Sequence, residues 1–220
     1  MTRTKPQMPL PPSRIKGLYA VTPDNADTAA LLTLARQVLR GGARWLQYRN
    51  KTAGAELRLE QAGALLALCR EFDARLIIND HVDLALAIGA DGVHLGGDDG
   101  DITAARQRLG AGKIIGVSCY NRMDLAVAAA SQGAAHLADY VAFGSFFASA
   151  TKPQAAVAPL ELLRQAKQQL SLPVVAIGGI TPENAGELIA AGANALAVIN
   201  ALFAAENVES ATRQFCRLFE

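Results

Sequence analysis

Eight short apolar runs alternate with longer stretches rich in alanine and leucine between residues 17 and 199. The runs predict strands at Gly17–Val21, Arg44–Tyr48, Arg75–Ile78, Gly92–Leu95, Ile114–Val117, Tyr140–Phe143, Val174–Ile177 and Ala195–Ile199. The intervening stretches predict helices that include Ala26–Arg40, Glu56–Phe72, Met123–Gln132, Leu160–Gln169 and Pro182–Ala191. This alternation is typical of a parallel sheet with crossover helices, and eight strands close into a barrel more naturally than they form an open sheet. The sequence therefore predicts a (β/α)8 TIM barrel of the α/β class.

A glycine-alanine pair precedes several predicted strands, at Gly41-Gly42-Ala43, Gly89-Ala90, Gly133-Ala134 and Gly192-Ala193. Glycine at the end of a helix accepts the left-handed conformation that stops it. These turns are structural and mark the end of the barrel where the strands begin. Functional residues are therefore expected at the opposite rim, where the strands of such barrels end.

The length of 220 residues suits one such barrel. The first 13 residues hold four prolines and no periodic apolar pattern. We therefore predict a flexible leader over residues 1–14 and one catalytic barrel domain over residues 15–220.

The charge balance excludes several classes of partner. Lysine and arginine number 21 and aspartate and glutamate 20, so no large field attracts nucleic acid or a membrane surface, and anion binding must be local. The widely spaced Cys69, Cys119 and Cys216 predict free, buried thiols in a reducing compartment. With no signal peptide and no membrane-spanning run, the expected location is the cytoplasm, the expected partners are small molecules, and self-association is left open.

The second predicted strand ends in Gln47-Tyr48-Arg49-Asn50-Lys51. Alternation along an extended segment points Gln47, Arg49 and Lys51 to the same side. An isolated pair of cations of this kind is often a solvated strand end. Its position at the functional rim favours a pocket instead.

Carboxylates follow the next two strands, at Asn79-Asp80 and at Gly96-Gly97-Asp98-Asp99. Two hard oxygen ligands, completed by water and phosphate oxygens, suit Mg²⁺ bound to a diphosphate. We predict Asp80 and Asp99 as the metal ligands. The alternatives are a helix cap for Asp80 and a turn or cap for Asp98 or Asp99.

Hydroxyl groups follow the fifth and sixth strands. Ser118 comes after Val117 and could donate to a substrate or cap a helix near Asn121. The loop from Ser145 to Gln154 contains Ser149, Thr151 and Lys152, a composition that can surround anionic oxygens, and this loop is our candidate lid.

The last two strands end in Gly178-Gly179-Ile180-Thr181-Pro182 and in Ile199-Asn200-Ala201. Pro182 is placed to begin a helix, and Gly179 allows the backbone to approach a ligand closely. The loops after strands seven and eight form the usual phosphate site of these barrels. We thus expect a metal-assisted diphosphate site near strands two to four and a monophosphate site near strands six to eight.

Over about Gly17 to Ala201 these motifs resemble, in order, those of the thiamine phosphate synthase family. The family's Gln-Leu-Arg-x-Lys, Asn-Asp, Val-His-Leu-Gly-Gln-x-Asp and Thr-x-Thr-Lys segments have counterparts here. The counterparts are Gln47, Arg49 and Lys51; Asn79 and Asp80; Val93 to Asp99; and Ser149, Thr151 and Lys152, together with Ser118 and Gly178-Gly179-Ile180.

The resemblance implies a role for each matched position. A pyrimidine diphosphate would be bound by Gln47, Tyr48, Arg49, Asn50, Lys51, Asn79, Ser118 and Lys152, and Mg²⁺ by Asp80 and Asp99. A thiazole phosphate would be bound by Ser149, Ala150, Thr151, Gly179, Ile199 and Asn200. Arg49, Lys51, Ser118 and Lys152 would be the catalytic residues.

The reaction that the resemblance implies joins the two substrates into thiamine phosphate and releases pyrophosphate. The bond from carbon to pyrophosphate breaks first, and the thiazole nitrogen then captures the pyrimidine methyl cation. The sequence departs from the family at His81, where arginine is common, at Gly97 for glutamine, at Ser149 for threonine and at Asn200 for serine. Loss of a cation at position 81 predicts weaker diphosphate binding, and Gly97 removes a polar contact. Ser149 and Asn200 keep hydrogen-bonding capacity, so altered affinity is expected there more than lost activity.

Two other functions fit a related barrel: a thiazole tautomerase, and a non-catalytic regulatory protein that binds thiazole phosphate. Neither needs the complete set of Asp80, Asp99, Arg49, Lys51 and Lys152, so its presence favours the coupling enzyme. His94 and His136 are the candidates for the acid–base chemistry of an isomerase. His94 lies within an apolar strand and is interpreted as an oriented structural histidine, and His136, in a helix-end turn, is expected to be exposed.

Overall fold

The computed structural model describes residues 15–96, 101–130, 137–148 and 157–220. Within these ranges, eight parallel strands form a closed barrel in sequence order, and β8 pairs with β1. The strands are β1 (Gly17–Val21), β2 (Trp45–Tyr48), β3 (Arg75–Asn79), β4 (Gly92–Leu95), β5 (Ile114–Tyr120), β6 (Tyr140–Phe143), β7 (Val174–Ile177) and β8 (Ala195–Val198). The predicted (β/α)8 barrel is confirmed.

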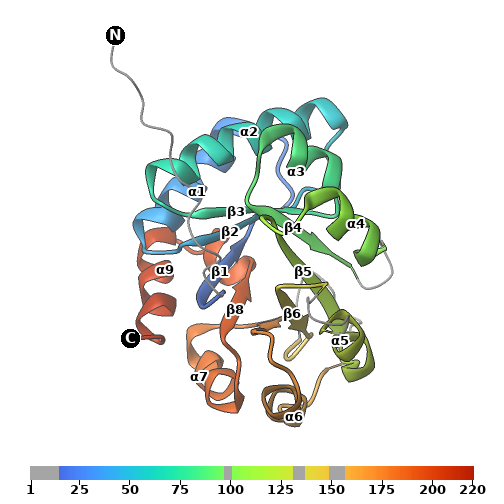
Figure 1. Cartoon of the computed structure of the whole chain (residues 1–220). Helices are drawn as coiled ribbons and strands as arrows, with labels where there is room; N and C mark the ends of the chain where they lie inside the picture. The colour runs from blue at the N-terminus through green and yellow to red at the C-terminus, as the bar shows by residue number, and fades with distance from the viewer. Residues whose placement is uncertain (1–14, 97–100, 131–136, 149–156) are drawn as a thin grey trace.

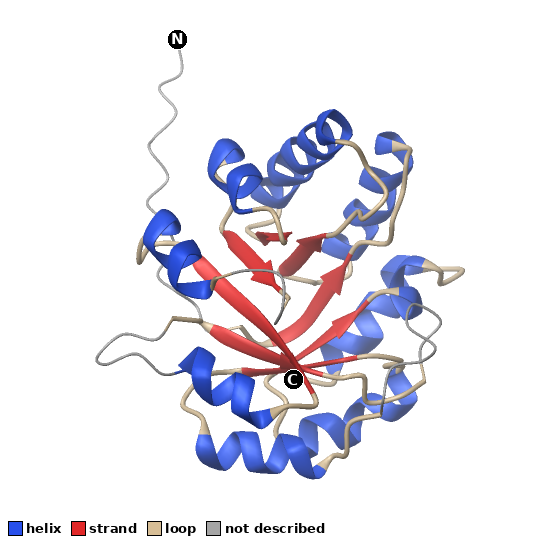
Figure 2. Cartoon of the chain, turned by 90° about the vertical axis from the view of Figure 1, so that its right-hand side faces the viewer, coloured by secondary structure: helices blue, strands red, loops and turns tan. Residues whose placement is uncertain are grey.

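Helices surround the strands on the outside of the barrel (Figures 1 and 2). They are α1 (Thr28–Arg40), α2 (Ala55–Glu71), α3 (Val82–Ile88), α4 (Ile102–Leu109), α5 (Met123–Ala130), α6 (Glu161–Gln169), α7 (Pro182–Ala191), α8 (Asn200–Phe203) and α9 (Val208–Arg217). Helix α9 follows the last strand and packs against α1 and β1, so the end of the chain closes the barrel wall beside its start.

Alternate residues of each strand enter two separate apolar clusters. In β1, Leu18 and Ala20 pack between the strands and the helices, whereas Tyr19 and Val21 pack inside the barrel with Trp45 of β2. This alternation follows from the two-residue period of a strand. Side chains fill the interior of the barrel, which is therefore a packed core and not a channel. The surface available for binding a ligand lies at the rim.

The predicted glycine turns lie where the strands begin. Gly42, Gly89 and Gly192 have φ values of 108°, 73° and 122°, which L-residues with side chains rarely adopt. The Gly133-Ala134 turn and His136 lie outside the described residues. At the other rim, β5 runs past its predicted end at Val117 to Tyr120, so Ser118 lies within a strand.

The predicted leader, residues 1–14, also lies outside the described residues. Among the described helices, none combines the length and the apolar character needed to cross a bilayer. Cys69 and Cys119 are buried free thiols, as predicted, and Cys216 is partly buried. Burial raises the pKa of the Cys69 thiol to about 12, so this thiol stays protonated and inert.

Candidate functional site

A cavity of about 800 Å³ opens at the rim where the strands end. Its volume is in the range of pockets that bind small molecules. The predicted site residues that line it are Gln47, Arg49, Lys51, Asn79, Asp80, Ser118, Gly179, Ile199 and Asn200. The fold thus brings together at one cavity residues that are spread over about 150 positions of the sequence.

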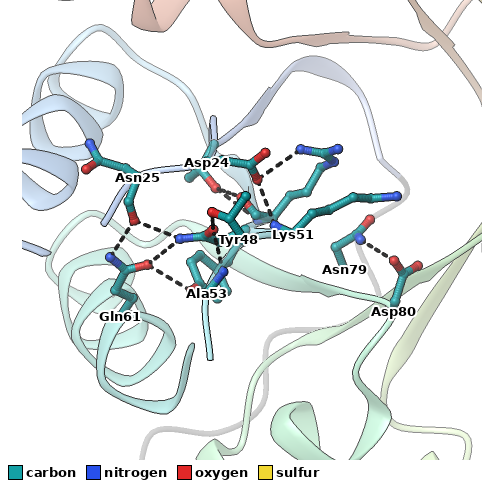
Figure 3. A network of polar contacts seen from close by, with 12 residues as sticks. Asp24, Asn25, Tyr48, Lys51, Ala53, Gln61, Asn79 and Asp80 are labelled. Atoms are coloured by element: carbon teal, nitrogen blue, oxygen red, sulfur yellow. Dashed lines mark hydrogen bonds and ion pairs between the residues drawn. The ribbon is translucent and has the colours of Figure 1, made fainter. Parts of the chain in front are cut away.

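The end of β2 carries two cations, Arg49 and Lys51, and a carboxylate from the loop after β1 contacts the side chain of the first and the backbone of the second. Asp24 Oδ1 accepts a hydrogen bond from the Lys51 amide at 2.7 Å and pairs with Arg49 Nη1 at 3.2 Å. Figure 3 shows the Lys51 side chain extending toward Asn79 and Asp80, and all three residues line the cavity. The Arg49 side chain is only 16% exposed. This ion pair therefore holds one cation in a defined position beside the cavity.

Tyr48 and Asn50 turn to the opposite side of β2 from the cations. The Tyr48 hydroxyl donates to Gln61 Oε1 of α2 at 2.8 Å, and Asn50 Nδ2 donates to the same oxygen at 3.1 Å and to the Asn25 carbonyl at 2.7 Å (Figure 3). Burial raises the pKa of the Tyr48 hydroxyl to about 12. These contacts anchor the strand end to α2, and a contact of either side chain with substrate stays a prediction.

Asp80 presents its carboxylate at the end of β3. Its backbone has a φ of 61°, and Asn79 Nδ2 donates to Asp80 Oδ2 at 2.6 Å. The N-cap of α3 is His81, which makes no side-chain cap, so the cap alternative for Asp80 is wrong. The corresponding cap of α4 is Asp101, which accepts from two amides.

Asp99, the other predicted metal ligand, lies outside the described residues. Within the part of the chain that is described, no group of three or more histidine, cysteine, aspartate or glutamate side chains could hold a metal. Of the two predicted ligands, Asp80 is therefore the one that the described residues place, and it borders the cavity.

His81, the first departure from the family pattern, is the N-cap residue of α3. The pKa of His81 lies below its ordinary value because of partial burial and because of the nearby charge of Arg58 in α2.

Four hydrogen bonds cross the floor of the cavity. Gln47 Nε2 donates to the Tyr19 hydroxyl at 2.8 Å, which lies 2.8 Å from the Tyr140 hydroxyl. His94 follows, with Nδ1 3.0 Å from the Tyr140 hydroxyl and Nε2 2.8 Å from Ser118 Oγ. Burial lowers the pKa of His94 to about 4, so the ring is neutral at pH 7. Ser118 therefore belongs to this network, well before α5 begins at Met123.

Glycine and main-chain atoms form the opposite side of the cavity, after β7. Gly178 and Gly179 have φ values of 104° and 62°, and a Cβ on Gly179 would lie 2.3 Å from the Ala148 carbonyl oxygen. Asn184 fixes this turn, since its Nδ2 donates to the Gly179 carbonyl at 3.0 Å and its Oδ1 accepts from the Thr181 amide at 2.9 Å. Pro182 begins α7, as predicted.

Some predicted site residues lie outside the described residues: Asp99, Ser149, Ala150, Thr151 and Lys152. Among the described residues, the structure adds cavity-lining side chains that the sequence did not single out, namely Tyr19, Tyr120, Asn121, Ser145 and Thr181. The sequence also did not single out Asp24, although it follows the first strand at the functional rim. Examining every strand end, including the first, would have found it.

The fold and the cavity define a class of protein: a (β/α)8 barrel that binds phosphorylated small molecules at its rim, with cations on one side and a glycine turn on the other. The sequence profile described as "Thiamine monophosphate synthase" matches residues 18–202, and the chain belongs to this family.

Individual relatives agree over nearly the whole chain. The chain is 58% identical to a thiamine-phosphate synthase of Methylobacillus flagellatus over 96% of its own length and 97% of the relative's. It is 53% identical to one of Nitrosospira multiformis, covering 96% and 88%. A solved thiamine phosphate pyrophosphorylase of Pyrococcus furiosus superposes with a TM-score of 0.81 at 37% identity, covering 92% of this chain and 95% of that one.

Proposed function

We propose that the rim cavity joins 4-amino-2-methyl-5-(diphosphooxymethyl)pyrimidine to 4-methyl-5-(2-phosphooxyethyl)thiazole, with the diphosphate bound beside β2 to β4 and the monophosphate beside β6 to β8. The chain is a transferase of the family that makes thiamine phosphate and releases pyrophosphate. The observation that carries the division into two sides is the convergence of Arg49, Lys51 and Asp80 on one wall of the cavity, opposite the Gly178-Gly179 turn.

The cationic wall suits a leaving pyrophosphate. Negative charge on this group grows as its bond to carbon breaks, so preorganised cations stabilise the transition state more than the ground state. Arg49 and Lys51 border the cavity, and Lys152 would complete the set from the loop after β6. Gln47 and Ser118 border the floor and would hold the pyrimidine, with Asn79 beside the diphosphate.

The carboxylate of Asp80 fits a role as Mg²⁺ ligand. It is half-buried at the cavity, is oriented by Asn79 and is not used as a helix cap. A hard carboxylate oxygen on an open cavity suits Mg²⁺, which keeps water and phosphate oxygens among its ligands. Asp80 and Asp99 would hold the ion, which when bound supplies positive charge to the diphosphate oxygens.

The glycine wall suits a phosphate whose charge does not change in the reaction. Gly179, Ile199 and Asn200 border the cavity where main-chain groups can approach a ligand. Ser149, Ala150 and Thr151 would add hydroxyl and amide donors from the loop after β6. This wall would position the thiazole nitrogen toward the pyrimidine carbon.

The chemistry of coupling requires no general base. The bond from carbon to pyrophosphate breaks first, the lone pair of the thiazole nitrogen then captures the pyrimidine methyl cation, and no proton is transferred. The neutral His94 ring keeps positive charge away from the cation-like carbon that forms above the floor. Exclusion of water from that carbon is the role we propose for the loop Ser145–Gln154 as a lid.

The test is pyrophosphate release by the purified protein given both substrates, with Mg²⁺ and then with EDTA. We expect Mg²⁺-dependent release of pyrophosphate, with one thiamine phosphate formed for each pyrophosphate. Either substrate given alone should release no pyrophosphate. Binding of thiazole phosphate without any release would contradict the proposal and favour the tautomerase or the regulatory protein, with His81, Gly97 and Asn200 as the first positions to revert to the family residues.

A further inference from the structure

Two tyrosines to which the coupling chemistry gives no role lie at the bottom of the cavity, Tyr19 in its lining and Tyr140 packed behind it. Tyr19 and Tyr140 are 1% and 0% exposed, yet their hydroxyl groups lie 2.8 Å apart inside the barrel. Buried hydroxyl groups cost free energy unless each finds a partner. Here each has two, because Tyr19 also contacts Gln47 and Tyr140 also contacts His94. The five residues Gln47, Tyr19, Tyr140, His94 and Ser118, called here the floor relay, form an unbroken chain from β2 to β5.

The barrel is built to leave room for this chain. His94, Gly116 and Tyr140 are register partners on the neighbouring strands β4, β5 and β6. A Cβ on Gly116 would lie 2.0 Å from Tyr140 Cζ and 2.3 Å from its hydroxyl oxygen. The Tyr140 ring therefore occupies the space of the missing side chain, where it stacks on His94 with ring centroids 5.6 Å apart.

The floor relay has a direction. Gln47 Nε2 can only donate, so the Tyr19 oxygen accepts from it. A buried hydroxyl hydrogen needs an acceptor, and we assign the Tyr19 hydrogen to the Tyr140 oxygen, 2.8 Å away. By the same reasoning we assign the Tyr140 hydrogen to His94 Nδ1. A neutral imidazole that accepts at Nδ1 carries its hydrogen on Nε2, which donates to Ser118 Oγ. The Ser118 hydrogen is left free to point into the cavity.

We propose that Tyr140 is a positioning residue that, with Tyr19, fixes the tautomer of His94 and thereby makes Ser118 a hydrogen-bond donor to the substrate. The other end of the floor relay is fixed in the same way, because the amide nitrogen of Gln47 is engaged and its oxygen remains as an acceptor. The floor thus offers an acceptor from β2 and a donor from β5, both bordering the cavity.

This pattern selects a ring with a donor on one edge and an acceptor on another, as an aminopyrimidine has. The identity of the substrate in this inference rests on the proposed function, whereas the hydrogen-bond geometry of the floor relay does not. The tautomer of His94 is a property of the protein without ligand. Failure of the two proposals can therefore be told apart.

The test begins with the unmutated protein, by nitrogen NMR of its imidazoles. The chain has three histidines, and loss of one set of signals in His94→Asn assigns the set of interest. We expect His94 to be neutral at pH 7 with its hydrogen on Nε2. A hydrogen on Nδ1 in the unmutated protein would overturn the proposal, whatever any variant does.

The second step is Tyr140→Phe, which removes one oxygen and keeps the ring. We expect the Nδ1 and Nε2 tautomers of His94 to become mixed. We also expect kcat/KM for the pyrimidine diphosphate to fall about tenfold, the usual scale for one hydrogen bond in a site. Tyr19→Phe removes the hydrogen bond that commits the Tyr140 hydrogen to His94. It should therefore also mix the tautomers, but less than Tyr140→Phe, and should cost less activity.

Thr212→Val is the matched control, since it removes a buried hydroxyl from α9, far from the cavity. It should change neither the His94 signals nor kcat/KM. A purely structural role for Tyr140 predicts a lower unfolding temperature with an unchanged tautomer. That result would overturn the proposal, as would a mixed tautomer with unmutated kcat/KM.

Discussion

The two sides of the rim cavity are built from different parts of the chain. Beside β2 and β3, side chains form the surface: Arg49 paired to Asp24, Lys51, and Asp80 oriented by Asn79. Beside β7, the surface is main chain at Gly178 and Gly179, where a side chain would collide with the loop after β6. On the side of β2 and β3, each charged side chain can be substituted without changing the backbone. On the side of β7, the backbone conformation itself forms the surface, and it requires glycine.

On the proposed function, this difference follows from the charges of the two ligands during the reaction. The pyrophosphate gains negative charge as it leaves, so its side needs groups that respond strongly to that change, namely cations. The thiazole phosphate keeps its charge throughout and needs only a fixed set of donors. Substitutions on the cationic side should therefore lower kcat, and those on the glycine side should mainly raise the KM for thiazole phosphate.

The largest effect is expected at Lys152. Lys152→Ala should reduce turnover by about three orders of magnitude, because it removes a cation from the leaving group in a site that excludes water. Lys16→Ala, at the start of β1 and on the opposite rim, is the control for loss of a lysine. Steady-state kinetics and circular dichroism of both variants provide the measurement, and unmutated turnover in Lys152→Ala would remove Lys152 from the mechanism.

A smaller effect, of a different kind, is expected on the glycine side. Gly179→Ala should raise the KM for thiazole phosphate about thirtyfold with little change in the KM for the pyrimidine diphosphate, since the strained backbone and the displaced Ala148 carbonyl cost roughly 2 kcal/mol. Gly186→Ala in α7 is the matched control, because a Cβ there meets nothing within 4 Å.

If Gly179→Ala lowers kcat and leaves both KM values unchanged, the proposed difference between the cationic side and the glycine side is wrong. Thermal unfolding separates lost binding from lost structure. Gly186→Ala should be as stable as the unmutated protein or slightly more stable, since alanine favours a helix over glycine.

Much of the fold could be predicted because each barrel unit repeats the same local signals. The branched apolar runs gave all eight strands, and Gly42, Gly89 and Gly192 marked where helices stop. The error at the end of β5 has a physical cause. Ser118, Cys119 and Tyr120 lack the apolar pattern that marks a strand, but the irregular pairing with β6 between Ser118 and Tyr120 keeps them in the sheet.

The cavity-lining residues were predicted at the strand ends where polar residues interrupt an apolar run. What could not be predicted is how polar groups pair across the barrel. Tyr19 and Tyr140 lie in different apolar strands, and only closure of the barrel brings their hydroxyl groups to 2.8 Å. Asp24 was missed for another reason: its partners Arg49 and Lys51 come from the next βα unit, and nothing local marks the pairing.

Asp24 gives the smallest and most selective test of the cationic side. Its one oxygen serves two functions, since it accepts from the Lys51 amide and pairs with Arg49. Asp24→Asn keeps an acceptor for the amide and removes the charge, so kcat/KM should fall about threefold, as expected for a partly exposed ion pair. Asp24→Ala removes both contacts and should cost about tenfold, mainly in kcat, as expected for the cationic side.

The control for the Asp24 series is Glu71→Gln, which removes the charge from the Arg36–Glu71 pair on the outer helices and should leave kinetics unchanged. Equal losses in Asp24→Asn and Asp24→Ala would mean that the charge on Asp24, and not its hydrogen bond to the Lys51 amide, holds the cationic wall. A gain in activity for Asp24→Asn would mean that the carboxylate competes with the diphosphate for Arg49. In that case the backbone alone, and not the Asp24 carboxylate, holds Arg49 and Lys51 in place. The cationic side would then depend on its backbone, as the glycine side does.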